Sequence, residues 1–162
     1  MMQSIRSARR GFTILELLIV MFMAAIVGGM SMGKMHDIMM QQRVIRAAST
    51  IRTSVEDAFA IASRNRKPVR LVWDATNMQF DVTDRAGTTI YRHVGLGQDP
   101  YRLPQSAVTF SSSPVEIYPN GLAGSSLTIT LSTALSASTA ARTITVSRAG
   151  MVQVLAGTVQ TQ

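Results

Sequence analysis

The 162-residue chain carries 16 basic and 9 acidic side chains, for a formal net charge of +7, and 46% of its residues are apolar. Charged residues make up only 15% of the chain, against about 25% in soluble domains, and this apolar composition excludes an ordinary disordered chain. The absence of cysteine excludes a disulfide framework, a cysteine-ligated zinc site and a cysteine nucleophile. The 11 methionines fall mostly within the first forty residues, so the chain joins two pieces of different composition.

The N-terminal piece has the pattern of a membrane segment. Residues 1–11 hold three arginines and no acid, and residues 12–33 hold one charge, Glu16. A helix rises about 1.5 Å per residue, so about 20 residues cross the apolar core of a bilayer. The sequence therefore predicts a transmembrane helix over 12–33, with a cytoplasmic N-terminus and a periplasmic remainder.

Two other interpretations of residues 12–33 remain open. A secretory signal peptide has a shorter apolar core, of about 7–15 residues, and a small-residue cleavage site, for which only Ala24-Ala25 and Gly28-Gly29 offer candidates. A plain signal anchor leaves Glu16 unexplained, because a carboxylate inside a bilayer costs about 2.5–3.5 kcal/mol. An ionisable residue in such a segment needs a partner and indicates a function.

Residues 9–20, RRGFTILELLIV, resemble the N-terminal signal of type IV pilins and type II secretion pseudopilins. Those proteins have a short basic leader ending in glycine, followed by phenylalanine and a glutamate that opens a long apolar helix. The resemblance implies that a prepilin peptidase cuts between Gly11 and Phe12 and N-methylates Phe12. Cleavage would leave 13 basic and 9 acidic side chains, a formal charge of +4.

The resemblance also assigns Glu16 a role in assembly. Cleavage creates a cationic amine at Phe12, and Glu16 lies four residues later on the same helical face. In a filament this carboxylate would pair with the amine of a neighbouring subunit and set the register, because a buried unpaired charge is costly. The alternative is a tolerated interfacial carboxylate. Gly29 and Gly33 form a G-x-x-x-G pattern, which favours close helix packing in membranes or loosens the helix locally.

The second piece opens with an amphipathic pattern. Apolar residues recur at spacings of three and four, which predicts one helix from about Thr13 to Ser63 whose second half packs on a sheet. Pro68 ends this helix, because proline disfavours helical backbone in the residue before it. The apolar stripe consists of Val44, Ala47, Ala48, Ile51, Val55, Ala58 and Ala62.

Short alternating runs then predict antiparallel strands joined by turns. Ala149-Gly150 is expected to be the tight turn of the final hairpin, and residues 132–141 an exposed loop. The predicted strands cover residues 69–73, 79–83, 88–94, 108–110, 115–118, 127–132, 142–147 and 151–155.

The resulting fold class is α+β, a long N-terminal helix packed on an antiparallel β-sheet, which again resembles pilins. The turn Tyr118-Pro119-Asn120-Gly121, the strand 127–131 and the hairpin 142–152 are similar to the C-terminal half of GspH/FimT-type minor pilins. DNA-binding FimT-like proteins have a Gly-Arg-x-Arg stretch at the last hairpin, whereas this chain has Gly150-Met151-Val152-Gln153. The expected parts are a leader over 1–11, a transmembrane half-helix over 12–33, an amphipathic half-helix over 34–64 and a periplasmic β-rich domain over 65–162.

The sequence offers little for catalysis or metal binding. Neither His36 nor His93 has a nucleophile motif beside it, and no phosphate-binding or zinc motif is present. We predict no catalytic residues, no metal and no cofactor, and we expect Trp73 to be a packing anchor. Four oxygen-bearing side chains could bind calcium, but their spacing fits no EF-hand, and a solvated hairpin rim is the competing interpretation. They are Asp74, Asn77, Asp81 and Asp84.

Arg64, Arg66, Lys67 and Arg70 form the strongest charge cluster. Four cations within seven residues could contact phosphates, or they could complement the negative end of the helix dipole.

The sequence thus predicts a structural protein rather than an enzyme: a minor pilin or pseudopilin of a type IV pilus or a type II secretion pseudopilus, near the tip or in the priming complex. The expected partners are prepilin peptidase, other major and minor pilins or pseudopilins, the inner-membrane assembly platform and membrane lipid. The alternative is a DNA-binding minor pilin acting in natural transformation. A membrane-anchored periplasmic enzyme is a third class, for which the sequence supplies no catalytic constellation.

Overall fold

The computed structural model describes residues 13–132 and 140–158, and the chain divides into two compact units, residues 1–37 and 38–162. Helix α1 runs from Ile14 to Asn65 and contributes to both units. The predicted helix is therefore confirmed to within two residues at each end. Within the described residues, no helix combines the length and the apolar character needed to cross a membrane.

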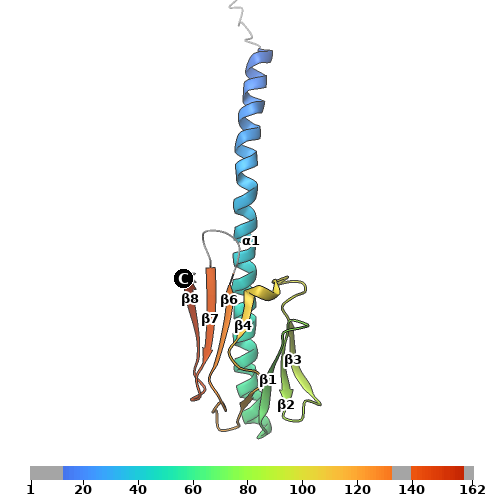
Figure 1. Cartoon of the computed structure of the whole chain (residues 1–162), viewed down its shortest axis with the longest axis vertical. Helices are drawn as coiled ribbons and strands as arrows, with labels where there is room; N and C mark the ends of the chain where they lie inside the picture. Colours follow the sequence, from blue (N-terminus) through green and yellow to red (C-terminus); the bar gives the residue numbers. More distant parts are fainter. Residues whose placement is uncertain (1–12, 133–139, 159–162) are drawn as a thin grey trace, which may run out of the picture. The chain divides into compact units, whose positions relative to one another are not determined.

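Two four-stranded antiparallel sheets follow α1 in the second unit (Figure 1). Sheet A has the strand order β3-β2-β1-β5, and sheet B has the order β4-β6-β7-β8. The strands of sheet A are β1 (Val69–Asp74), β2 (Gln79–Asp84), β3 (Ile90–Gly95) and β5 (Val115–Ile117). Those of sheet B are β4 (Val108–Phe110), β6 (Leu127–Ser132), β7 (Ala140–Val146) and β8 (Val152–Thr158).

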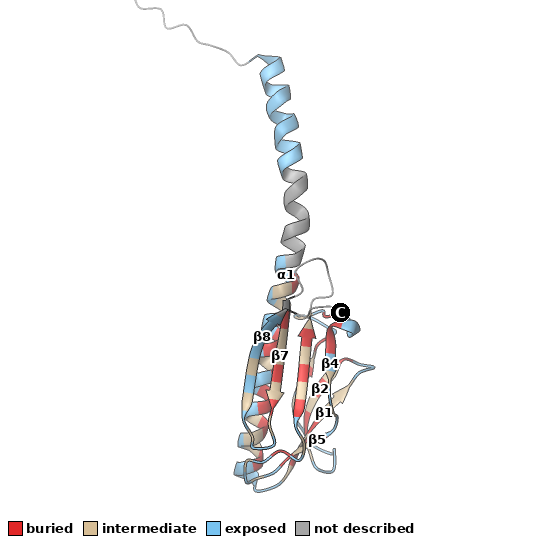
Figure 2. Cartoon of the chain, turned by 60° about the vertical axis from the view of Figure 1, so that its left-hand side comes forward, coloured by how far each residue is buried: buried red, intermediate tan, exposed pale blue. Residues whose placement is uncertain are grey.

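One hydrophobic core joins the second half of α1 to both sheets. The seven residues of the predicted apolar stripe are all at most 2% exposed. They pack with inward-facing residues of sheet A, such as Leu71 and Val82, and of sheet B, such as Ile129 and Ile144. Buried and partly buried residues alternate throughout β6, as expected for a strand with one face on the core. Figure 2 shows buried positions on strands of both sheets.

Aromatic side chains connect the two sheets where the chain passes between them. Phe110 of β4 stacks on Trp73 of β1 with ring centroids 4.3 Å apart, and it also stacks on Phe80 of β2 at 5.8 Å. The hydroxyl of Ser113 accepts a hydrogen bond of 2.8 Å from the backbone N–H of Trp73. Trp73 is therefore a packing anchor, as predicted.

Local polar contacts explain two of the boundaries that differ from the prediction. The loop expected over 132–141 is wrong at both ends, because Ser132 belongs to β6 and β7 begins at Ala140, with Ala141 buried. The strand expected to begin at residue 88 begins at Ile90, because Thr88 and Thr89 both donate backbone hydrogen bonds to the Asp84 carboxylate. The strand expected to end at Tyr118 ends at Ile117, because Tyr118 opens a turn closed by Gly121. No second helix was expected, whereas the structure has a three-residue 3-10 turn, η1 (Gln105–Ala107).

The turn after β5 packs directly against the turn between β7 and β8. Gly150 adopts a left-handed conformation with φ of +79°, and a Cβ atom added there would overlap the carbonyl oxygen of Gly121. The N–H of Ala123 donates a 3.0 Å hydrogen bond to the carbonyl of Arg148, which holds the same two turns together. The two glycines quoted in the resemblance to minor pilins thus meet at one contact, which leaves no room for a side chain.

We predict that Gly150→Ala lowers the free energy of unfolding by about 2–5 kcal/mol, through backbone strain and overpacking together. Gly87→Ala is the matched control, because Gly87 also has a left-handed φ of +75° but open space around its Cα. We expect that control to lose only about 1–2 kcal/mol. Urea unfolding of the full chain in detergent measures both values, and equal losses would contradict the role of the Gly121 contact.

Candidate functional site

The first turn of α1 contains a helix cap that includes Glu16. The hydroxyl of Thr13 accepts a hydrogen bond of 3.2 Å from the backbone N–H of Glu16, and the carbonyl of Thr13 accepts one of 3.2 Å from Leu17. A threonine followed three residues later by glutamate is the capping-box pattern. The sequence analysis missed this cap, although the Thr-x-x-Glu pattern could have revealed it. Glu16 takes part in this cap through its backbone N–H.

The helix beyond this cap is apolar on all sides. Every side chain from Thr13 to Val27 is exposed, with Ile14 at 88% and Phe22 at 66%. In this part of the chain no cation forms an ion pair with the Glu16 carboxylate. A helix of this kind needs an apolar medium or other helices around it. The carboxylate of Glu16 is the only charged group of this segment that could form an ion pair with a neighbouring chain.

Several residues from the sequence predictions fall outside the described part of the chain. Gly11 and Phe12 precede it. Gly29, Gly33 and His36 belong to α1 but lie where the structure describes the backbone only.

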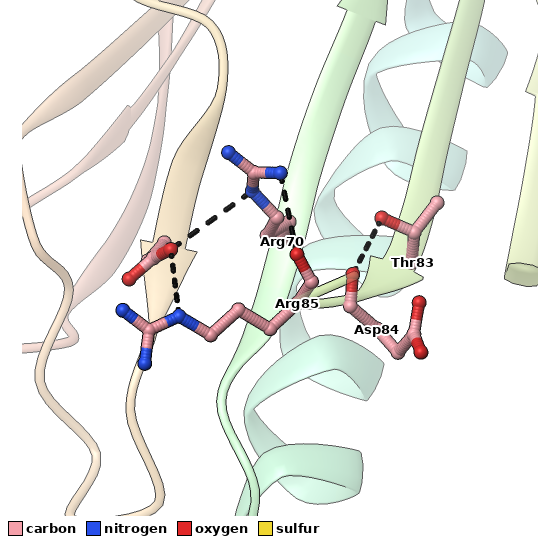
Figure 3. A network of polar contacts seen from close by, with 5 residues as sticks. Arg70, Thr83, Asp84 and Arg85 are labelled. Carbon is pink, nitrogen blue, oxygen red and sulfur yellow. Dashed lines mark hydrogen bonds and ion pairs between the residues drawn. The ribbon is translucent and has the colours of Figure 1, made fainter. Parts of the chain in front are cut away.

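The predicted cluster of four cations is divided in the structure. Arg70 on β1 places its Nε atom 3.9 Å from the carboxylate of Glu116 on β5, and Arg85 places its Nε atom 3.4 Å from the same oxygen. Arg70 also donates a hydrogen bond of 3.3 Å to the carbonyl of Arg85, so the two guanidinium groups converge on one acid (Figure 3). Arg70 is thus part of a cross-strand ion-pair network.

The other three cations remain exposed where α1 ends. Arg64 belongs to the last turn of α1, and Arg66 and Lys67 follow it; none of them forms an ion pair within the described residues. The hydroxyl of Ser63 donates a 3.3 Å hydrogen bond to the carbonyl of Pro119, which brings the turn with the exposed Tyr118 to this end of the helix. Sequence reasoning missed this neighbourhood because about fifty residues separate its parts.

The four oxygen-bearing side chains considered for calcium take part in separate local contacts. The Asp74 carboxylate accepts hydrogen bonds from the backbone and side chain of Asn77, and the side-chain bond is the main cause that lowers the pKa of Asp74. The Asp84 carboxylate closes the next turn, and hydrogen bonds from the Thr89 backbone and the Thr88 hydroxyl lower its pKa. In the described residues, no group of three or more acidic or histidine side chains is placed to hold a metal.

His93, which the sequence left without a partner, lies beside Asp81. Its Nδ1 atom on β3 is 2.6 Å from the Asp81 carboxylate on β2, and the two residues are directly opposite in the strand register. Both side chains are therefore engaged across the sheet. Asp81 is partly buried in this pair, with 19% of its side chain exposed, so it is not simply a solvated rim residue.

A shallow cavity of about 260 Å³ lies between α1 and β3. Arg92 of β3 donates a 2.9 Å hydrogen bond to the Asp57 carboxylate at its wall, and Ile61 and Tyr91 supply apolar surface. Ligand pockets usually measure about 300–1,000 Å³ and carry converging polar groups. Asp57 and Arg92 pair with one another, Arg64 is the other charged residue of the lining, and the lining contains no nucleophile paired with a base.

Comparisons with known proteins agree with this geometry. Residues 6–32 match the family model of the prokaryotic N-terminal methylation motif. The structure resembles a crystal structure of the type IV minor pilin FimU from Pseudomonas aeruginosa strain PAO1, with a TM-score of 0.54, 15% identity, and coverage of 70% of this chain and 89% of that chain. A second crystal form of FimU matches with a TM-score of 0.49, 14% identity, and coverage of 68% and 90%. No curated protein sequence matches the chain.

The fold is therefore that of a pilin, a long N-terminal helix packed on antiparallel sheets. Together with the methylation motif, it supports a type IV pilin-like protein. The motif implies processing by a prepilin peptidase and association with other pilins. Proteins of this kind are anchored in a membrane and incorporated into filaments.

Proposed function

We propose that the chain is a minor pilin or pseudopilin, a structural subunit near the tip or in the priming complex of a type IV pilus or type II secretion pseudopilus. The observation that carries this proposal is the apolar helix over residues 14–27, with Glu16 as its sole charge, which lies within the methylation motif of residues 6–32. Such a surface suits lipid before assembly and neighbouring helices afterwards. The globular unit, with no catalytic constellation in its described residues, would serve as a contact surface for other subunits.

The proposed anchor is a transmembrane helix over residues 12–33 with its N-terminus in the cytoplasm. The three arginines of the leader favour that orientation, because basic residues remain on the cytoplasmic side of a membrane. The β-rich unit would then lie in the periplasm. Gly29 and Gly33 would allow close helix contacts in the membrane or in the filament.

Processing between Gly11 and Phe12 would remove the leader and expose the amine that Glu16 needs. The Thr13 cap places the Glu16 backbone in the first turn of α1, and Glu16 follows Phe12 by four residues in the sequence. In an apolar bundle, the carboxylate would favour the register that supplies the amine of a neighbouring subunit. The capping box offers a competing explanation for Glu16, since glutamate and glutamine serve equally well in that motif.

We predict that Gly11→Leu blocks cleavage, because a large side chain would occupy the position next to the scissile bond where the motif has glycine. Intact mass spectrometry of the chain purified from a producing cell would then show the uncut, unmethylated species. Ala8→Leu is the matched control inside the leader, and it should be cut normally. An unchanged mature mass for Gly11→Leu would contradict the processing site.

We predict that Glu16→Gln and Glu16→Ala each reduce incorporation into filaments about tenfold or more, while membrane insertion stays intact. An ion pair in an apolar environment is worth more than the 1.4 kcal/mol that corresponds to a factor of ten. Immunoblots of sheared filaments and of membranes measure the two quantities. Both variants keep the backbone N–H that donates to the Thr13 hydroxyl, and glutamine also keeps the residue type of a capping box while removing the charge. Normal incorporation of Glu16→Gln, with Glu16→Ala still impaired, would therefore assign the Glu16 side chain to the cap.

Glu56→Ala is the control for a general effect of removing an acid from α1. Its carboxylate pairs with Arg52 at 2.8 Å on the exposed face, with about half of each side chain accessible. Surface pairs of this kind contribute about 0–1 kcal/mol. This variant should enter filaments like the unmodified chain.

Nucleic-acid binding is the second candidate function, favoured by the exposed cations Arg64, Arg66 and Lys67 beside the turn of Tyr118. Aromatic rings between cations suit single-stranded nucleic acid, where bases stack and phosphates pair. Two facts oppose it: Arg70 is engaged by Glu116, and no arginine follows Gly150 in the last hairpin.

This second candidate predicts that the full chain in detergent shifts a single-stranded oligonucleotide in a gel. Contacts from three cations would weaken the binding constant with salt at a log–log slope of about −2. The triple change of Arg64, Arg66 and Lys67 to glutamine should abolish the shift, whereas Arg52→Gln should preserve it. Absence of any shift at low salt would remove this candidate.

A further inference from the structure

Three of the four sheet edges in the globular unit carry features that discourage pairing with another chain. Strand β3 carries Arg92 and His93, and its pairing with β2 contains a register shift. Strands β4 and β5 are only three residues long, and β5 is further flanked by a bridge from Ile117 to Ala123. Charge, irregularity and short length are the usual protections of an exposed edge.

Strand β8 (Val152–Thr158) is different. It is seven residues long, VQVLAGT, with neither a charged residue nor a proline. It ends the strand order of sheet B, so among the described residues only β7 pairs with it. An uncharged edge strand of this length is a ready template for another strand. Its contrast with the other three edges is what requires an explanation.

The hairpin turn determines which backbone groups of β8 are free. The N–H of Ser147 donates a 2.9 Å hydrogen bond to the carbonyl of Met151, so this pair is hydrogen-bonded. In an antiparallel ladder such pairs alternate with non-bonded ones. The register then makes Gln153, Leu155 and Gly157 the residues that bond to β7. The N–H and C=O groups of Val152, Val154, Ala156 and Thr158 consequently point away from the sheet.

The side chains along this edge are also unusually apolar for a free surface. Leu155 and Met151 are 56% and 57% exposed, whereas Val152 and Val154 pack against the core. The neighbouring positions on the outer face are threonines, with Thr143 opposite Leu155 and Thr130 opposite Thr143. In this cross-strand row the outer face therefore changes from hydroxyl side chains to a large apolar one as it reaches the open edge.

We propose that the open edge of β8 accepts an extended strand from a different filament subunit, which continues sheet B across the subunit boundary. This inference rests on the proposed function and names the kind of partner that the globular unit contacts. Free donors and acceptors recur every second residue, about 6.8 Å apart, and another extended backbone matches that repeat. The partner strand would be uncharged and would place an apolar side chain beside Leu155.

The geometry disfavours β8 of a second copy as the occupant. Two β8 strands paired antiparallel about a two-fold axis would run the α1 helices of the two copies in opposite directions. Subunits of one filament share a single direction, because their N-terminal segments enter from the same membrane. The acceptor edge therefore pairs with a different strand on its neighbour.

Hydrogen exchange of the full chain tests the proposal directly. Mass spectrometry would compare the chain alone in detergent with the chain in sheared filaments. The expected result is that the amides of Val154 and Ala156 exchange at least tenfold more slowly in filaments. Gln153, Leu155 and Gly157 serve as internal references, because β7 already protects them. The β3 amides that point away from β2 should not change.

Two variants carry the test further. Leu155→Lys places a charge beside the edge, and Ala156→Pro removes an outward N–H without touching a bond to β7. Both should reduce incorporation into filaments at least fivefold, with the thermal midpoint of the purified chain and leader cleavage little changed. Thr130→Lys, in the same cross-strand row but two strands inward, is the matched control and should be incorporated normally.

The outcomes separate this inference from the proposed function. If the chain enters filaments but its Val154 and Ala156 amides exchange as fast as in detergent, the acceptor edge is wrong and the filament role stands. If the chain never enters filaments, both fail. The chain has no cysteine, so a Leu155→Cys variant reports self-pairing cleanly. A disulfide-linked homodimer of that variant in filaments would overturn the choice of partner.

Discussion

One apolar stripe on the second half of α1 supports the entire globular unit. Its central residues, Ala47, Ile51, Val55 and Ala58, are fully buried, and both sheets pack on them. Small alanines let strands approach the helix, while isoleucine and valine fill the space between the sheets. Neither sheet has a second core of its own, so the position of every strand depends on this stripe. The same dependence leaves the outer sheet faces and edges available for contacts.

The polar groups of the globular unit mostly hold the chain in place. Asp74 and Asp84 accept the hydrogen bonds that close two turns. Glu116 forms ion pairs with Arg70 and Arg85, and Asp57 forms one with Arg92. Groups engaged in this way are poorly placed for acid–base chemistry, which needs a partner that can exchange a proton with a substrate. Three features of the described residues still lack a partner: the apolar helix with one carboxylate, the open edge of β8 and the exposed cations at the end of α1. The helix and the strand edge suit assembly with other chains.

The two glycine turns show how strongly the fold constrains a few positions. Gly150 needs its left-handed backbone for the β7–β8 turn, and it also lies against Gly121 from a turn about thirty residues earlier. Sequence patterns identified both turns, since glycine marks such positions. Their contact could not be predicted from those patterns, because it depends on how sheet B and the turn after β5 are stacked on the helix.

Much of the secondary structure could be predicted, because it depends on local patterns of apolar and polar residues. The spacing of apolar residues defined α1 to within two residues at each end, and alternation located all eight strands of the described residues. The division into two sheets was not predicted, because alternation marks which residues face the core and says nothing about which strand lies beside which. The pairing of His93 with Asp81 and of Arg70 with Glu116 was hidden for the same reason.

The amino-acid sequence by itself determined the methylation motif, the single acid of the apolar helix, the class of fold and the absence of cysteine chemistry. These properties depend on residue type and on short spacings along the chain, so they do not depend on which distant residues come into contact. Tertiary structure alone decided which cations remain free and which strand edge remains open. Both depend on contacts between residues far apart in sequence, whose energy is gained only when the two sheets come together on α1.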